Sequence, residues 1–454
     1  MLLRKREKDI TQWIREGTNA LLVTGARQTG KTFLIEKLLV REKCDYVEFN
    51  LIKQPEVVEI LEAVKDQKPE VFLSRLTLLS SKELVKGKTV LFFDEIQMYK
   101  EILTVIKFLV LEGSFRYVLS GSLLGVELVG IKSAPVGYLT MIQLFPMDFE
   151  EYLRALNIQE SSIESLRSCF EKHEPVDDFI HKKLLEVFYT YLVVGGMPAA
   201  VQNYVDEHDF NKVIKIHDSI RELYKLDYSQ YEQEHKLKLI ETYNLIPAEL
   251  NSKNKRYIFT DLNKHLKFER YESSFAWLCN AGVALPVFNT TEPKVPLESN
   301  KKSNLFKLFL SDVGMLSTMY GRATQLKLLN SGQDLNCGAI FENFVAQELV
   351  THGYKGYYYS GKRLGEIDFL IEYDNECLPI EVKSGKDYSV HPSLDKILSD
   401  RNFSINQAFV CSSQNIAVDG KIVYLPIYMT MFINENSIEL PSKTPFDPAD
   451  FYRK

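Results

Sequence analysis

Residues 20–32 read ALLVTGARQTGKT, and this stretch decides how the first third of the chain folds. An apolar run of strand length comes before a glycine-rich turn, and the segment FLIEKLLVREK after the turn has helical periodicity. The turn fits the spacing G-x-x-x-x-G-K-T without a mismatch. Glycines there let backbone N–H groups point at one anion, and the following helix adds the positive end of its dipole. The stretch therefore predicts a loop that binds the phosphates of a nucleotide.

Two residues at the end of this loop have specific predicted roles. Lys31 is expected to reach the terminal phosphates, and the Thr32 hydroxyl to ligate Mg²⁺. The expected cofactors are therefore ATP and Mg²⁺. The remaining residues of the predicted phosphate loop are Gly25, Ala26, Arg27, Gln28, Thr29 and Gly30.

Two further strands are expected to complete this site. TVLFFDE (89–95) is a continuous apolar run, typical of a strand that is buried on both faces of a parallel sheet. Asp94 at its end is the predicted second magnesium partner, and Glu95 is the type of residue that polarises an attacking water. The Asp-Glu pair favours hydrolysis over phosphoryl transfer to a metabolite. In RYVLSGS (116–122), Ser120 either senses the terminal phosphate or simply ends the strand in a turn.

A second motif lies near the other end of the chain. Residues 365–385 read GEIDFLIEYDNECLPIEVKSG, two strand-like runs around a polar turn. Asp368, Glu381 and Lys383 match the pattern D-xn-ExK of restriction-endonuclease-like nucleases. Asp368 and Glu381 are expected to hold Mg²⁺ or Mn²⁺. Lys383, on the same strand face as Glu381, would position a water or stabilise charge on a phosphate. A surface ion pair, or a fold kept for DNA binding without cleavage, are the alternatives.

The motifs together resemble a known family. GARQTGKT, VLFFDEIQ, SGSLLG, LFPMDFEEYL, YLVVGGMP, AWLCNAGV, LFKLFLSDVGML, AIFENFVAQEL, EIDFLIE and PIEVKSG follow in this order. They resemble prokaryotic AAA+-like P-loop ATPases with a conserved C-terminal region of unknown function. The resemblance implies an ATP-binding core, a winged-helix-like middle and a nuclease-like end. Glu342, on AIFENFVAQEL, resembles the further metal-binding acid that restriction-endonuclease-like nucleases place on the preceding helix, and Glu366 lies on the same strand face as Asp368.

One segment departs from this family pattern. AAA+ ATPases place an arginine after the sensor strand, but GVELVGIKSAPVGYL (125–139) contains none, and Lys132 is its only cation. Because such an arginine accelerates phosphoryl transfer by roughly 10³–10⁵-fold, slow hydrolysis is expected. Arg27 and Arg116 are the two candidates for a substitute.

The predicted fold class is α/β, in four parts. Residues 1–155 form an AAA+-like P-loop core with a parallel sheet, and 156–230 a helical lid or linker. Residues 231–322 form a winged-helix-like domain. Residues 330–454 form a restriction-endonuclease-like α/β domain.

Charge and composition limit which partners the chain is expected to bind. The net charge is −6 at pH 7, so DNA binding has to come from local patches. Residues 251–270 carry six Lys or Arg against two acids, a net of +4, with interleaved aromatics. This segment is predicted to contact DNA, together with Lys301 and Lys302 and the C-terminal domain; a solvated helix face is the alternative. No signal peptide, membrane span or CxxC pair is present, which predicts a cytoplasmic protein that does not bind membranes. A homo-oligomer is left open.

The sequence thus predicts slow ATP hydrolysis that controls a DNA-acting, metal-dependent nuclease-like domain. The alternative is a nucleotide-dependent switch that binds DNA or protein partners without cleavage.

Overall fold

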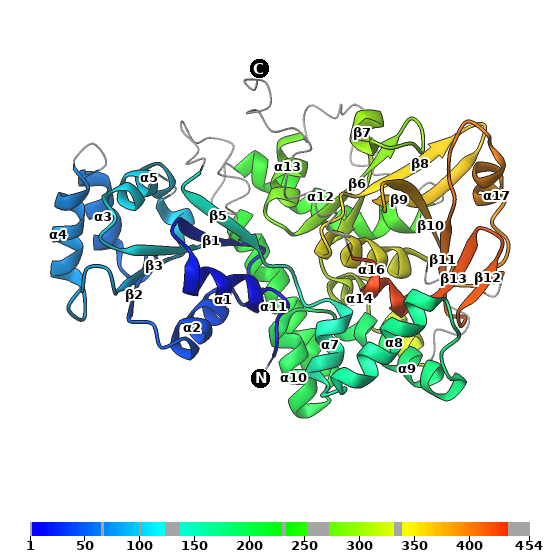
Figure 1. Cartoon of the computed structure of the whole chain (residues 1–454), viewed down its shortest axis with the longest axis horizontal. Coiled ribbons are helices and arrows are strands. Elements are labelled where there is room, and N and C mark those ends of the chain that lie inside the picture. Colours follow the sequence, from blue (N-terminus) through cyan, green and yellow to red (C-terminus); the bar gives the residue numbers. More distant parts are fainter. Residues whose placement is uncertain are drawn as a thin grey trace, which may run out of the picture.

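A computed structural model of the chain describes residues 2–64, 68–99, 101–122, 137–228, 233–252, 272–330, 338–385 and 387–434. The predicted basic segment 251–270 lies almost entirely outside these ranges, and so does Lys132. Two sheets form the two ends of the molecule, and helices fill the space between and below them (Figure 1).

The N-terminal sheet is parallel, as the alternation of strands and helices predicted. Its strands are β1 (Ala20–Thr24), β2 (Tyr46–Asn50), β3 (Val90–Asp94), β4 (Arg116–Ser120) and β5 (Leu139–Gln143). Their order is β2-β3-β4-β1-β5, so β4 lies between the strand that precedes the glycine-rich loop and the strand that ends in Asp94. This order brings the polar ends of β1, β3 and β4 to one edge of the sheet.

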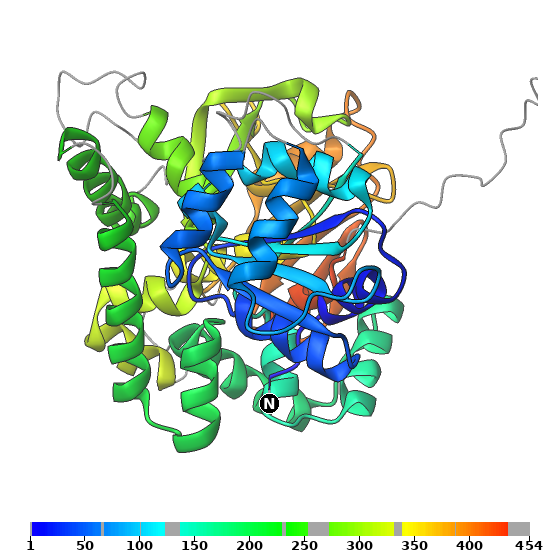
Figure 2. The same ribbon diagram turned by 90° about the vertical axis from the view of Figure 1, so that its left-hand side faces the viewer.

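Helices cover both faces of this sheet, which explains its continuous apolar strands. The helices α1 (Glu7–Glu16) and α2 (Lys31–Arg41) pack on one face. The other face carries α3 (Pro55–Val64), α4 (Pro69–Leu79), the short helix η1 (Ile96–Tyr99) and α5 (Ile102–Glu112). Figure 2 views the molecule from the side of this sheet, with the second sheet behind it.

The middle of the chain is helical. Its helices are α7 (Phe149–Ala155), α8 (Glu160–Lys172), α9 (Asp178–Val194), α10 (Pro198–Glu207), α11 (Phe210–Tyr228), α12 (Gln233–Asn251), α13 (Glu272–Asn280), α14 (Val313–Tyr320) and α15 (Arg322–Leu329). They share one hydrophobic core with α16 (Gly338–Thr351) and with one face of the second sheet. The helical region is therefore packed against the C-terminal region.

The second sheet is mixed and has the order β12-β13-β11-β10-β9-β8-β6-β7. Its strands are β6 (Ala284–Thr290), β7 (Lys301–Leu310), β8 (Tyr357–Gly361), β9 (Gly365–Tyr373), β10 (Glu376–Val382), β11 (Ala408–Ser412), β12 (Ala417–Asp419) and β13 (Ile422–Pro426). The short helices η5 (Leu297–Asn300) and η6 (Ile427–Phe432) flank it. Helix α16 covers one face, and α17 (Pro392–Ser399) covers the other.

The hairpin β6–β7 does not stand apart as the wing of a separate domain. Residues 288–290 of β6 pair in parallel with 357–359 of β8, so strands from 231–322 and 330–454 form one sheet. Pairing with β8 satisfies backbone groups that would otherwise form an open edge. The segment 253–271, which would supply a helix of the predicted winged-helix-like domain, lies outside the described residues, so that domain stays a prediction. The other predicted domain limits also stay predictions.

Helix α16 fixes the end of β7 through its polar side chains. The Asn343 amide accepts from the Leu310 backbone N (2.8 Å) and donates to the Leu310 carbonyl (3.0 Å), as a neighbouring strand would. One helical turn on, Gln347 accepts from the Val313 backbone N at 2.9 Å.

Within the described ranges, no helix combines the length and apolar character that spanning a bilayer requires.

Candidate functional site

The glycine-rich loop has the backbone that its sequence requires. Gly25 and Gly30 have φ values of +138° and +87°, which favour glycine. A Cβ on Gly25 would lie 2.0 Å from the Leu144 carbonyl oxygen, so no larger residue fits there. The Lys31 ammonium donates to the carbonyl oxygens of Gly25 (3.0 Å) and Ala26 (2.9 Å), which holds it inside the curve of the loop.

Asp94 is the centre of a polar cluster at the edge of the parallel sheet. Its carboxylate accepts from the Thr32 hydroxyl, 3.1 Å from each oxygen, and from the Ser120 hydroxyl. The structure thus brings Thr32, Asp94 and Ser120 together. Asn50 is a member that sequence reasoning missed: its Nδ2 donates to Asp94 Oδ2 at 3.0 Å. The available signal was its place at the end of a strand, DYVEFN, like Ser120 at the end of β4.

Glu95 follows β3 in a left-handed conformation, with φ +58°. This region is uncommon for a residue with a side chain and recurs at functional sites. The carboxylate accepts a hydrogen bond from the Gln97 amide, and the residue is partly exposed. Glu95 therefore sits beside the Asp94 cluster without joining it.

The loop is also clamped from outside the parallel sheet. The Thr29 carbonyl accepts from the Arg4 guanidinium (3.0 Å), and the Arg27 carbonyl accepts from the Tyr224 hydroxyl of α11 (3.4 Å). A cavity of about 260 Å³ adjoins the loop; it is mainly apolar, and Leu2, Phe33, Pro198, Ala199 and Gln202 help to line it. The nucleotide loop is thus in contact with the N-terminus, α10 and α11.

Arg116 does not reach this site. It begins β4, whereas Ser120 ends it, so the two lie at opposite edges of the sheet. Its guanidinium donates to the Ile14 carbonyl at 2.5 Å and lies 6.0 Å from the centroid of the Trp13 ring. Within one chain, Arg116 is therefore not placed to act on the nucleotide site, and its role as a substitute for the absent arginine stays a prediction.

The predicted C-terminal residues also converge, from α16, β9 and β10. Asp368 Oδ2 accepts from the Val382 backbone N at 2.9 Å, which ties β9 to the end of β10. Lys383 Nζ donates to Glu381 Oε1 at 2.9 Å. Burial raises the pKa of Glu381 to about 8, helped by the charges of Asp368 and Glu342 and opposed by Lys383. These residues form what we call the carboxylate centre, with Glu366 at its rim.

Lys307 of β7 belongs to this centre, and sequence reasoning missed it. Its Nζ lies 2.9 Å from Glu366 Oε1 and 3.7 Å from both Glu342 Oε2 and Asp368 Oδ1. Burial alone would lower the pKa of Lys307, but the charges of Glu342, Asp368 and Glu366 hold it above its usual value. Lys307 lies within residues 231–322, outside the D-xn-ExK motif, and the sheet pairing brings it to that motif.

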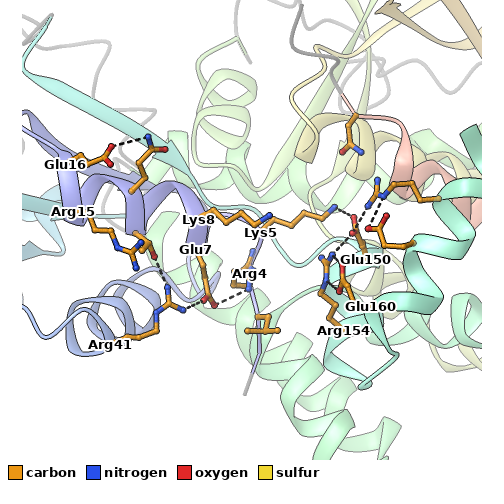
Figure 3. Close-up of a pocket in the computed structure, with 16 residues that line it drawn as sticks. Arg4, Lys5, Glu7, Lys8, Arg15, Glu16, Arg41, Glu150, Arg154 and Glu160 are labelled. Carbon is orange, nitrogen blue, oxygen red and sulfur yellow. Dashed lines mark hydrogen bonds and ion pairs between the residues drawn. The ribbon is translucent and has the colours of Figure 1, made fainter. Parts of the chain in front are cut away.

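A charged network links the N-terminus to α7 and to the end of α16. Figure 3 shows one contact of this network, between Lys5 and Glu150. Lys5 Nζ lies 2.7 Å from both Asp148 Oδ2 and Glu150 Oε2. Across the network, Nε2 of His352, the residue that follows α16, lies 3.4 Å from Asp148 Oδ2. Burial opposes ionisation of Asp148, but Lys5 and His352 hold the pKa of that carboxyl below its usual value.

A cavity of about 910 Å³ lies beside this network, between the α1–α2 side and the α7–α8 side. It is lined by charged side chains, but several of its cations are already engaged in ion pairs. Arg15 pairs with Glu42, Arg41 with Glu7, and Arg154 with Glu150 and Glu160. We therefore assign it no ligand.

Comparison with known proteins divides the chain into three matched segments. Residues 17–153 match the family model of an AAA domain, which contains the glycine-rich loop and the Asp94 cluster. Residues 185–326 and 337–429 match two models described only as domains of unknown function, DUF8612 and DUF4143. No protein with a curated description matches the chain.

Solved structures match over most of the chain, at low similarity. The Walker-type ATPase PABY2304 of Pyrococcus abyssi is 14% identical, covers 70% of this chain and 96% of its own, and has a TM-score of 0.43. Cdc6p from Pyrobaculum aerophilum is 15% identical, with coverages of 73% and 95% and a TM-score of 0.27. The Drosophila ORC bound to DNA is 16% identical, with coverages of 74% and 97% and a TM-score of 0.26.

Scores this low carry no argument about the site or its partners. The AAA match and the loop geometry do not depend on them. The N-terminal part of the chain is therefore a P-loop ATPase domain of the AAA type.

Proposed function

We propose that the chain hydrolyses ATP slowly and that its nucleotide state controls a metal-dependent, DNA-cleaving centre in the C-terminal region. The observation that carries this proposal is the convergence of Glu342, Asp368, Glu381 and Lys383 from three separate elements. Carboxylates with a neighbouring lysine are the groups that metal-dependent phosphodiester cleavage requires.

The ATP site has a role for each group in it. The N–H groups of residues 25–30 bind the phosphates, and Lys31 turns from the loop carbonyls to the terminal phosphate. Thr32 and Asp94, already 3.1 Å apart, hold Mg²⁺. Glu95 polarises the attacking water, and Ser120 senses the terminal phosphate. The adjoining cavity of about 260 Å³ suits the adenine base, because Leu2, Phe33 and Pro198 give it apolar walls.

The carboxylate centre has the type of donor atom that a divalent ion prefers, but its acids would have to move closer together to hold one: among the described residues, only Asp148, Glu348 and His352 place three ligand atoms within 4.8 Å of one another. Its donors are hard carboxylate oxygens, which Mg²⁺ and Mn²⁺ prefer. Glu381 Oε2 is buried and has no hydrogen-bond partner among the described residues. An atom left this way costs about 1–3 kcal/mol, which a bound cation would offset. We propose that Asp368, Glu381 and Glu342 hold the ion.

When bound, such an ion lowers the pKa of a coordinated water and neutralises charge on the scissile phosphate. Lys383 Nζ, 2.9 Å from Glu381, is placed to orient that water or to contact the phosphate. The backbone N of Val382 holds Asp368 in position at 2.9 Å.

DNA is the proposed substrate, with 251–270 and the C-terminal region as its contacts. The local net charge of +4 over 251–270 supports this choice in an acidic chain. Lys301, at the start of β7, pairs with Glu298 and lies 4.3 Å from the centroid of the Phe288 ring, so it is partly engaged within the hairpin.

The second candidate is a nucleotide-dependent switch that binds DNA or a protein without cutting. One observation favours it: the Lys307 ammonium already contacts three acids of the carboxylate centre. An internal cation there reduces the negative charge that attracts a metal ion.

The test is cleavage of linear, supercoiled and branched DNA with Mg²⁺ or Mn²⁺, with and without ATP. The variants are Asp368→Ala and Lys31→Ala, and Glu376→Ala, an exposed acid of β10, is the matched control. Cleavage that is lost in Asp368→Ala, altered in Lys31→Ala and kept in Glu376→Ala supports the first proposal. DNA binding without cleavage under every condition, with ATP still hydrolysed, supports the switch.

A further inference from the structure

Lys307 enters the carboxylate centre from a strand far from the motif. It lies on β7 opposite Val287 of β6, and β6 and β8 separate β7 from β9 in the sheet. The side chain nevertheless crosses this distance: its Nζ lies 5.0 Å from the centroid of the Tyr358 ring on β8 and 3.7 Å from Asp368 on β9. Its exposed fraction is 0%. Burying an ammonium is unfavourable unless negative partners surround it, so its position depends on the acids.

Four carboxylates and two ammonium groups meet here. The acids are Glu342, Glu366, Asp368 and Glu381, and the cations are Lys307 and Lys383. In the ion-bound form, with every group ionised, the charge of these six groups is −4 + 2 = −2. One divalent ion balances this charge, whereas two would leave an excess of +2.

The contacts divide the centre into two sides. On one side, Lys307 Nζ lies 2.9 Å from Glu366 Oε1 and 3.7 Å from both Glu342 Oε2 and Asp368 Oδ1. On the other side, Lys383 Nζ lies 2.9 Å from Glu381 Oε1, and Glu381 Oε2 is buried without a hydrogen-bond partner among the described residues. Each side thus holds one lysine ammonium, but Lys307 is fully buried among three acids, whereas Lys383 pairs with one oxygen of Glu381 and leaves the other oxygen without a hydrogen bond.

We propose that Lys307 is a fixed cation of the carboxylate centre, which takes the place of a second divalent ion and limits the centre to one. This inference rests on the proposed function. Centres with two ions hold them about 3.5–4 Å apart, each balanced by carboxylates. An ammonium fixed 2.9 Å from Glu366 Oε1 repels a second divalent ion from that oxygen, because like charges interact strongly at short range in a buried site.

Lys307 is therefore a positioning residue. It holds Glu342 and Asp368 near Glu381 and lowers their mutual repulsion. It also makes the hairpin β6–β7 a part of the centre, although the D-xn-ExK motif lies wholly on β9 and β10.

The test is the number and affinity of Mn²⁺ ions bound by the full chain without nucleotide, measured by equilibrium dialysis and by the electron spin resonance of free Mn²⁺. Wild type is expected to bind one ion at the carboxylate centre, lost in Asp368→Ala. Lys307→Met removes the charge and keeps an unbranched side chain. It is expected to bind a second ion, or the first one roughly 10–100-fold more tightly. Lys355→Met is the matched control and leaves binding unchanged, since its side chain is 74% exposed.

Thermal unfolding supplies a second readout, because loss of a buried ammonium lowers stability without metal. Mn²⁺ is expected to raise the Tm of Lys307→Met by more than that of wild type, since the ion replaces the lost charge. If Lys307→Met does not fold, Glu366→Gln gives the test at a partly exposed residue. Its loss leaves Lys307 free to compete for the remaining acids, so Mn²⁺ affinity falls; unchanged affinity overturns the proposal.

The outcomes separate this inference from the proposed function. Equal binding by wild type and Lys307→Met overturns the role of Lys307 and leaves the metal centre standing. Binding by Lys307→Met alone overturns the metal-dependent function and supports Lys307 as a cation that replaces metal. Binding by neither overturns both.

Discussion

The Arg4 guanidinium donates to the backbone carbonyl of Thr29, inside the nucleotide loop, at 3.0 Å. The same side chain lies 3.1 Å from the Glu151 carboxylate on α7 and 2.6 Å from the Phe145 carbonyl. One buried arginine thus joins the phosphate loop to the helical region. Glu348 of α16 then accepts from the backbone N of Phe149 at 3.0 Å, which extends the contact to the helix that carries Glu342.

Replacing Arg4 by methionine is expected to destabilise the protein by about 3–5 kcal/mol, because it leaves a buried carboxylate without its cation. Both side chains are nearly buried, at 7% exposed for Arg4 and 4% for Glu151. The measurement is the free energy of unfolding in urea. Arg6→Met, which breaks an exposed pair with Asp9, is the control and should lose less than about 1 kcal/mol. Equal losses in the two variants would show that the buried Arg4–Glu151 pair stabilises the protein no more than the exposed Arg6–Asp9 pair does.

Asn50→Ala is expected to weaken Mg²⁺-dependent ATP hydrolysis by roughly 10–100-fold, the usual effect of removing a group that orients a metal ligand. The reason is the 3.0 Å hydrogen bond from Asn50 to Asp94 Oδ2, which fixes how the carboxylate faces Thr32. Phosphate release at several Mg²⁺ concentrations measures the effect. An unchanged Mg²⁺ dependence would contradict it, and Asn203→Ala on α10 is the control.

Glu95→Gln is expected to keep ATP binding and to slow hydrolysis by roughly 10²–10⁴-fold, because it removes the group that polarises the water. Binding of a fluorescent ATP analogue and phosphate release report the two steps separately. Glu83→Gln, at an exposed position, should alter neither. A variant that loses binding and hydrolysis together would instead indicate a structural role for the left-handed backbone at Glu95.

Stability is expected to fall in mild acid because of His217. Burial lowers the pKa of this histidine from 6.5 to about 4, opposed by a hydrogen bond with the Val194 carbonyl. The unfolded chain therefore takes up a proton near pH 6.5 and the folded chain only near pH 4. The stability that depends on a neutral His217 is fully present above pH 6.5. It is lost as the pH falls from 6.5 to 4, by on the order of 3 kcal/mol.

The comparison of wild type with His217→Gln isolates this effect. The variant should show a weaker fall in unfolding free energy between pH 6.5 and 4.5. The comparison is needed because burial raises the pKa of Asp312 from 3.8 to about 6, which acts in the opposite direction. His208→Asn, at an exposed cap where asparagine tolerates the positive φ of 54°, should behave as wild type. Parallel curves for wild type and His217→Gln would refute the prediction.

The nucleotide site could be predicted because its information is local. Gly25, Gly30, Lys31 and Thr32 lie within eight residues, and the backbone at the glycines leaves few alternatives. The prediction of Asp94 required only that one further strand, residues 89–95, be recognised. Asn50 was missed because an asparagine at a strand end has many uses, and the β2–β3 pairing alone brings it to Asp94.

The carboxylate centre could be predicted only in part. Asp368, Glu381 and Lys383 lie on two strands joined by a tight turn, so their proximity follows from a hairpin. Lys307 comes from a strand about 60 residues earlier, and its approach depends on the parallel pairing of β6 with β8. The run LFKLFLSD reads equally well as a wing or as an edge strand, and local pattern does not decide between them.

The shared sheet also bears on heredity. Since β8 takes β6 as its neighbour, a gene segment cut between residues 322 and 338 would separate partners that need each other. Recombination could move the parallel-sheet portion more readily than it could exchange the final third alone. The two segments of unknown function are then expected to be inherited as one block, and swaps between lineages to succeed only when the hairpin travels with the strands that follow it.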